Sequence, residues 1–237
     1  MSAIPPGVTG NPLPIGAPGA VVAELKPAWR GWIHAAITPI AVAAGIVLIC
    51  LADGPAAKWS CAVFALTSLL LFGNSALYHR IPWKPRTKAV FRRIDHANIL
   101  LLIAGTYTPI AVLALPTGQA VLLLSLVWSG AIAGILFRVF WLGAPRWVYV
   151  ALYIVLGWAA IMYIVPLYQA NAAMVVLIAA GGILYTLGAV VYALKRPNPW
   201  PSVFGFHEIF HVCTVLAFAC HWTACLLIAM NPVYHAG

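Results

Sequence analysis

Long apolar stretches alternate with short polar connections along most of the chain. Roughly 20 apolar residues are needed to cross a bilayer as a helix. The pattern predicts seven such spans, at residues 32–51, 60–79, 95–115, 119–141, 147–167, 172–194 and 204–230. Turn-forming residues separate several of them, at 53–55, 116–118, 143–145 and 197–199. Tight connections of this kind predict antiparallel neighbours in one all-α bundle.

Composition supports the membrane class and divides the chain. Of the 237 residues, 64% are hydrophobic and only 7% are charged, whereas a soluble domain carries about 25% charged residues. Residues 1–28 are rich in Pro and Gly and predict a flexible tail, which leaves 29–237 as the transmembrane domain. The net charge of +9 comes from the connections between spans, so it indicates positive loops at a bilayer and no nucleic-acid partner.

The basic residues predict an orientation. Twelve lie before the first span or after the second, fourth and sixth, whereas the opposite connections hold only Lys58. Because positive residues favour the cytoplasmic side, the N-terminus is expected in the cytoplasm and the C-terminus outside. The chain is therefore expected to be a multi-pass protein of the plasma (inner) membrane.

Ionisable residues inside the apolar stretches are the candidate chemistry, since they are costly there and mark functional interiors. His207 and His211, four residues apart, share one face of the last span and form a two-point metal clamp. The predicted orientation places His79 at the cytoplasmic end of the second span and Asp95 at the start of the third. All four side chains should then lie at the same membrane depth.

Three imidazoles and a nearby carboxylate suit Zn²⁺, because a catalytic zinc keeps three protein ligands and one open position for water. We expect His79, His207 and His211 as ligands, with Asp95 holding the water or acting as general base. Ser75 lies one helical turn before His79, where it could orient that ligand or donate to a substrate oxygen.

Other interpretations of the polar residues stay open. The sequence His-Glu-x-x-His also fits a zinc protease in which Glu208 is the general base, although Asp95 and His79 would then need separate explanations. Further histidines are interpreted as polar caps or interhelical hydrogen bonders, and three other polar residues as helix-packing groups. These are His34, His96, His221, His235, Asn98, Tyr107 and Thr108.

Three segments carry a family resemblance. Residues 74–79 read NSALYH, residues 95–109 begin DHANI and end AGTYTP, and residues 204–211 read FGFHEIFH. They resemble the signatures of the second, third and seventh spans of the hemolysin III family, in the progestin and adipoQ receptor (PAQR) superfamily. The three signatures occur in order on the right spans, and the resemblance covers residues 30–230.

The resemblance implies a seven-helix bundle with a cytoplasmic N-terminus and a zinc bound by His79, His207 and His211. It implies that Asp95 contacts the zinc through water, that Ser75 belongs to the site, and that the substrate is a lipid, with ceramide-type amides as the suspected class. The leading hypothesis is a zinc-dependent hydrolase of lipid amides or esters, or a protein of membrane lipid homeostasis. Its partners would be membrane lipids and an acyl substrate.

Two other functions stay open: a non-enzymatic lipid sensor or cytolysis-associated protein with structural zinc, and an intramembrane protease. The sixth span holds Gly181, Gly182 and Gly188, which could support close helix pairing. Such pairing could join two copies in a homo-oligomer or two helices of one bundle.

Overall fold

A computed structural model describes residues 27–141 and 143–234, so nearly all of the predicted tail lies outside the described residues. Within these described residues, seven spans are long and apolar enough to cross a membrane, which confirms the predicted all-α membrane bundle. A short 3₁₀ helix, Ala159–Tyr163, interrupts the fifth span. The α-helices are α1 (Trp32–Leu51), α2 (Gly54–Arg80), α3 (Pro85–Ala114), α4 (Thr117–Phe140), α5 (Arg146–Gly157), α6 (Ile164–Ala170), α7 (Ala172–Leu194) and α8 (Phe206–Met230).

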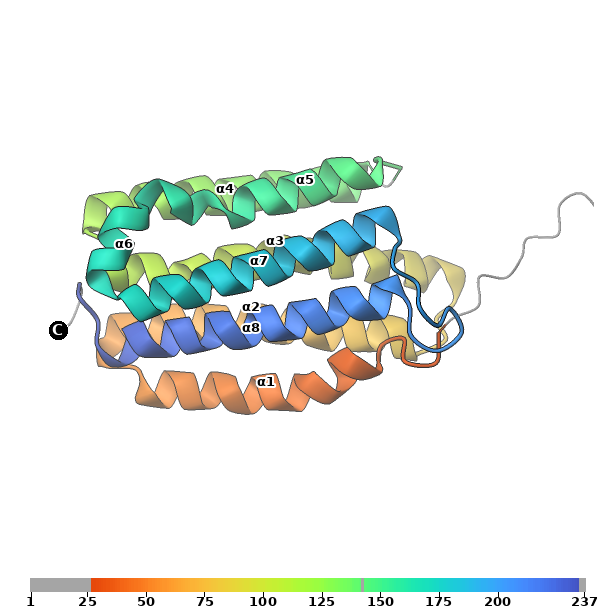
Figure 1. Cartoon of the computed structure of the whole chain (residues 1–237), viewed down its shortest axis with the longest axis horizontal. Coiled ribbons are helices and arrows are strands. Elements are labelled where there is room, and N and C mark those ends of the chain that lie inside the picture. Colours follow the sequence, from red (N-terminus) through yellow and green to blue (C-terminus); the bar gives the residue numbers. More distant parts are fainter. Residues whose placement is uncertain (1–26, 142, 235–237) are drawn as a thin grey trace, which may run out of the picture.

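The spans run roughly parallel to one axis and mostly pack against their neighbours in sequence (Figure 1). Helices α1 to α4 pack in succession, and α7 packs along α8. Helix α8 also contacts α1, α2 and α3, so the last span lies against the first three. This arrangement brings the start of α8 next to the end of α2 and the start of α1.

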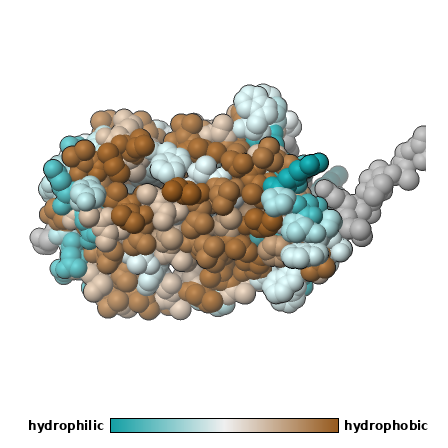
Figure 2. All heavy atoms as spheres, viewed as in Figure 1, coloured by the Kyte–Doolittle hydropathy of each residue, from teal (hydrophilic) through white to brown (hydrophobic). Residues whose placement is uncertain are grey.

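The surface matches a membrane setting. On the face shown in Figure 2, apolar residues cover most of the middle of the bundle, and hydrophilic residues lie mainly at its two ends. Large side chains such as Trp59, Val155 and Ile183 are more than half exposed. In water such exposure would be unfavourable, whereas in a bilayer these side chains contact lipid tails.

Two helices begin earlier than the apolar pattern predicted. The third span was expected from residue 95, but α3 begins at Pro85; the second was expected from residue 60, but α2 begins at Gly54. In both, proline occupies one of the first two helical positions, where its fixed φ suits the helix and its missing N–H costs nothing. Lys and Arg are good helix formers, so much of the predicted basic loop is the first part of α3.

The fifth span is broken, although the sequence predicted a continuous helix over 147–167. Tyr107 of α3 bridges the break: its hydroxyl donates to the Gly157 carbonyl oxygen (2.7 Å) and accepts from the Ala160 N–H (2.9 Å). Backbone polar groups within a bilayer need protein partners, and Tyr107 supplies one on each side of the break. The prediction that Tyr107 is a helix-packing hydrogen bonder is confirmed.

The glycines of the sixth span serve contacts within the bundle. A Cβ atom at Gly181 would lie 2.4 Å from the His221 ring, and one at Gly188 would lie 2.8 Å from Cys213 Cβ. Only glycine permits α7 and α8 to approach this closely. Asn98 also packs helices as predicted, because its amide donates to the Leu70 carbonyl oxygen of α2 (2.7 Å).

Candidate metal centre

Three histidines from two helices meet at one end of the bundle. His79 lies in the last turn of α2, and His207 and His211 lie in the first two turns of α8. One ligand atom from each lies within 4.8 Å of the others, and the Nε2 atoms of His79 and His207 are 3.2 Å apart. The sequence predicted a common depth for these residues, and the packing of α8 against α2 brings them together.

The arrangement fits a metal ion. Tetrahedral zinc with Zn–N bonds of 2.0–2.1 Å needs ligand nitrogens about 3.3 Å apart, close to the spacing of His79 and His207. His211 Nδ1 is buried and has no hydrogen-bond partner among the described residues. The three histidines are therefore close enough to hold a metal ion.

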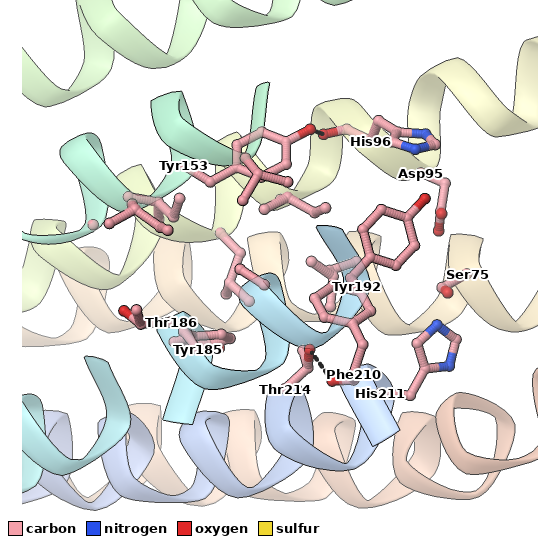
Figure 3. Close-up of a pocket in the computed structure, with 18 of the residues that line it drawn as sticks. Ser75, Asp95, His96, Tyr153, Tyr185, Thr186, Tyr192, Phe210, His211 and Thr214 are labelled. Carbon is pink, nitrogen blue, oxygen red and sulfur yellow. Dashed lines mark hydrogen bonds between the residues drawn. The ribbon is translucent and has the colours of Figure 1, made fainter. Parts of the chain in front are cut away.

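Asp95 and Ser75 lie beside the histidines and line the same cavity. Ser75 is buried on α2, one turn before His79. Its side chain interacts with the Asp95 carboxyl group of α3, and the two face each other above His211 in Figure 3. Asp95 is outside the group of three potential ligands, which leaves its carboxyl group available to act on a substrate or water.

Glu208 has a structural position within the His-Glu-x-x-His sequence. Its side chain is only 1% exposed, and its Oε2 accepts a hydrogen bond from the Gly205 N–H (2.9 Å) at the start of α8. Its other oxygen, Oε1, accepts from Arg30 Nε, just before α1, in an ion pair. One oxygen thus caps α8 and the other binds the segment before α1, and Glu208 is not part of the histidine group.

His34 is the neighbour of the site that sequence reasoning missed. Its ring stacks on His211 with centroids 3.8 Å apart and planes 7° apart, and it meets Phe72 edge-on at 5.1 Å. His34 is 3% exposed, so it is a buried wall of the site and not an interfacial cap. One signal was available: His34 lies at the cytoplasmic start of the first span in the predicted orientation, at the depth of His79.

A cavity of about 1000 Å³ opens beside the histidines, at the upper end of the range for small-molecule sites. Apolar residues of α3, α5, α6 and α7 form much of its wall, among them Leu102, Ile103, Ile154, Ile164 and Ile178. His221 lines the cavity too, with its Nε2 3.2 Å from the Ile178 carbonyl oxygen of α7. As predicted, His221 is a helix-packing residue outside the metal group.

Comparisons with known proteins agree with this architecture. The family described as "Haemolysin-III related" matches residues 23–222. The chain is 35% identical over 176 residues to the "Hemolysin-3 homolog" of Bacillus subtilis (strain 168), covering 73% of this chain and 79% of the relative. It is 34% identical over 171 residues to "Hemolysin-3" of Bacillus cereus, covering 72% and 74%. The predicted resemblance is confirmed: this chain belongs to the haemolysin III family of multi-pass membrane proteins, within the PAQR family.

Proposed function

We propose that the protein is a zinc-dependent membrane hydrolase of lipid amides or esters. The observation that supports it most is the group of three histidines at the polar end of a cavity large enough for an acyl chain. Zinc bound there would supply a Lewis acid that activates water and polarises a carbonyl group. The imidazole donor set, held by two helices, fits zinc better than it fits hard cations such as Mg²⁺.

The residues of the chain would divide the remaining work. Apolar side chains of α3, α5 and α7 would hold the acyl chain and exclude water. Asp95 would orient the attacking water, accept its proton and return it to the leaving amine or alcohol. Ser75, which interacts with Asp95, would hold that carboxyl group toward the histidines. The water oxygen would bond to the acyl carbon, and the C–N or C–O bond would then break as the leaving group takes the proton from Asp95.

The proposed reaction predicts a separation between metal binding and turnover. Asp95→Ala should leave the metal content of the detergent-purified protein unchanged and lower lipid hydrolysis at least about a hundredfold, as expected for loss of a general base. His79→Ala should remove both the metal and the activity. Metal analysis and release of fatty acid from ceramide and phospholipid substrates would measure the two effects.

Two results would contradict the hydrolase. The hydrolase proposal loses its basis if the wild-type protein holds no stoichiometric metal. Wild-type protein that holds zinc, hydrolyses no lipid and loses thermal stability when the zinc is chelated would instead identify a sensor with structural zinc. His221→Ala is the matched control for the metal content of His79→Ala, because His221 is a buried histidine outside the metal group.

A further inference from the structure

Three arginines from three helices gather near the polar end of the cavity. Arg92 lies on α3, Arg138 in the last turn of α4, and Arg146 is the first residue of α5. All three lie within electrostatic reach of His96, which is next to Asp95 at the polar end of the cavity (Figure 3). These three residues are called the arginine cluster below.

The arginine cluster has no acidic partner among the described residues. Among these described residues, the one ion pair is that between Arg30 and Glu208, which lies outside the cluster. Arg138 is only 6% exposed, and its Nη1 is buried without a hydrogen-bond partner in the described part of the chain. Burying a guanidinium group without an ion-pair partner is costly, so this arrangement favours a negative charge near the cluster.

Two tyrosines hold the cluster against the cavity. The Arg138 guanidinium lies 4.3 Å from the centre of the Tyr149 ring. The Arg146 guanidinium lies 4.7 Å from that of Tyr192, and its Nη1 donates to the Tyr192 carbonyl oxygen (3.0 Å). Both tyrosines line the cavity, as do Arg92 and Arg146 themselves. The N-terminal end of α5, with its partial positive charge, begins at Arg146 and adds to the same field.

Membrane topology alone does not account for this geometry. The positive-inside rule needs basic residues in connections at the cytoplasmic side, and exposed residues such as Arg86 and Lys195 satisfy it. It does not require burial of Arg138 or stacking of two guanidinium groups on tyrosines of the cavity wall. These features are typical of a binding site for a phosphate or a carboxylate.

We propose that Arg92 and Arg146, which line the cavity, bind the phosphoryl group of an acidic phospholipid whose acyl chain lies in the cavity, and that Arg138 adds its positive charge from beside them. The many apolar residues of the cavity wall favour a lipid over a free phosphate ion. This inference rests on the proposed function, because it names the substrate of that hydrolase. The bond cleaved would be the acyl ester bond of an acidic phospholipid whose headgroup lies beside Arg92 and Arg146.

The test measures binding, so it does not depend on hydrolysis. Full-length protein in dodecyl maltoside micelles is titrated with didecanoyl phosphatidylglycerol and, separately, with didecanoyl phosphatidylcholine, and tryptophan fluorescence reports binding. We expect phosphatidylglycerol to bind at least about tenfold more tightly than phosphatidylcholine, because its net negative charge strengthens the contacts with the arginines. Arg92→Gln, at an exposed position that should not disturb folding, should weaken phosphatidylglycerol binding about tenfold. Adding Arg146→Gln should abolish the preference.

Arg86→Gln is the matched control, because Arg86 is exposed on the same helix and does not line the cavity; it should leave binding unchanged. The proposal is overturned if both lipids bind equally, or if Arg86→Gln weakens binding as much as Arg92→Gln. It is also overturned if inorganic phosphate binds as tightly as the lipid, which would identify a site for the free ion. If the protein hydrolyses neutral lipids and does not prefer phosphatidylglycerol, the inference about the arginine cluster fails and the hydrolase proposal stands. If it prefers phosphatidylglycerol but hydrolyses no lipid, the hydrolase proposal fails and the binding site stands.

Discussion

At the scale of single residues, the site depends on side chains that hold the three histidines in place. Glu208 ties the start of α8 to the segment before α1 through Arg30 and the Gly205 N–H. His34 covers one face of the His211 ring. Partners of this kind orient metal ligands and tune their affinity. Neither residue belongs to the group of potential ligands, so their effects can be separated from metal binding itself.

Glu208→Gln should lower stability and spare the chemistry. The amide oxygen of glutamine can still cap α8, but Arg30 loses its ion-pair partner, at a cost of about 2 kcal/mol. Thermal unfolding of the purified protein measures the loss, and an Arg30→Gln/Glu208→Gln double mutant should recover part of it. If Glu208→Gln instead abolishes hydrolysis without lowering stability, Glu208 is the general base of a protease-like site and Asp95 is not.

With zinc held by the three histidines as proposed, His34→Ala should weaken its binding about tenfold, the lower end of the effect for residues that support metal ligands. The cause is loss of the ring that packs on His211 and fixes its plane. Competition with a zinc chelator measures the affinity. His34→Phe keeps a flat ring in the same place and should restore most of the zinc affinity. Equal losses in both variants would mean that the imidazole nitrogens matter and that His34 acts as more than a packing surface.

At the scale of elements, the break in the fifth span depends on a side chain of the third. The 3₁₀ helix between α5 and α6 lies against the cavity, whose wall includes Gly157, Trp158 and Ile161. The Tyr107 hydroxyl satisfies backbone groups on both sides of the break. In addition, Trp158 Nε1 donates to Thr186 Oγ1 of α7 (3.0 Å). Two neighbouring spans therefore fix the shape of this cavity wall.

Tyr107→Phe removes two hydrogen bonds at the break and should destabilise the bundle by about 2 kcal/mol. Unfolding in mixed detergent micelles measures the change. Tyr168→Phe is the control, because Tyr168 is 60% exposed on α6; it should have little effect. If the Tyr107→Phe protein is as stable as wild type, then water or another backbone conformation satisfies the backbone polar groups at the break.

At the scale of the whole molecule, the odd number of spans in the described part of the chain places the segment before α1 and the segment after α8 on opposite sides of the membrane. The basic residues predict that the end with the histidines faces the cytoplasm. A phosphatase fused to the C-terminus should then be active outside the cell, whereas green fluorescent protein fused there should be dark. A fusion after Arg196, between α7 and α8, should give the opposite pair of results. A fluorescent C-terminal fusion would refute the predicted orientation.

Much of this protein was determined by its sequence alone. The apolar pattern predicted all seven spans because crossing a bilayer imposes a minimum length and a composition on each helix. The same constraint made the few ionisable residues informative, so His79, Asp95, His207 and His211 could be assigned to one depth before any contact was known.

Only the tertiary structure determined which residues of different helices contact one another. The break at Gly157 depends on Tyr107, 50 residues away, and helix propensity around residue 157 does not reveal that partner. The stacking of His34 on His211 and the pairing of Arg30 with Glu208 depend on which helices lie side by side. Hydropathy fixes the depth of a residue along the membrane normal, whereas its lateral neighbours are fixed only by the packing of the spans. The sequence thus determined the membrane level of the site, and the packing of α8 against α1, α2 and α3 decided its composition.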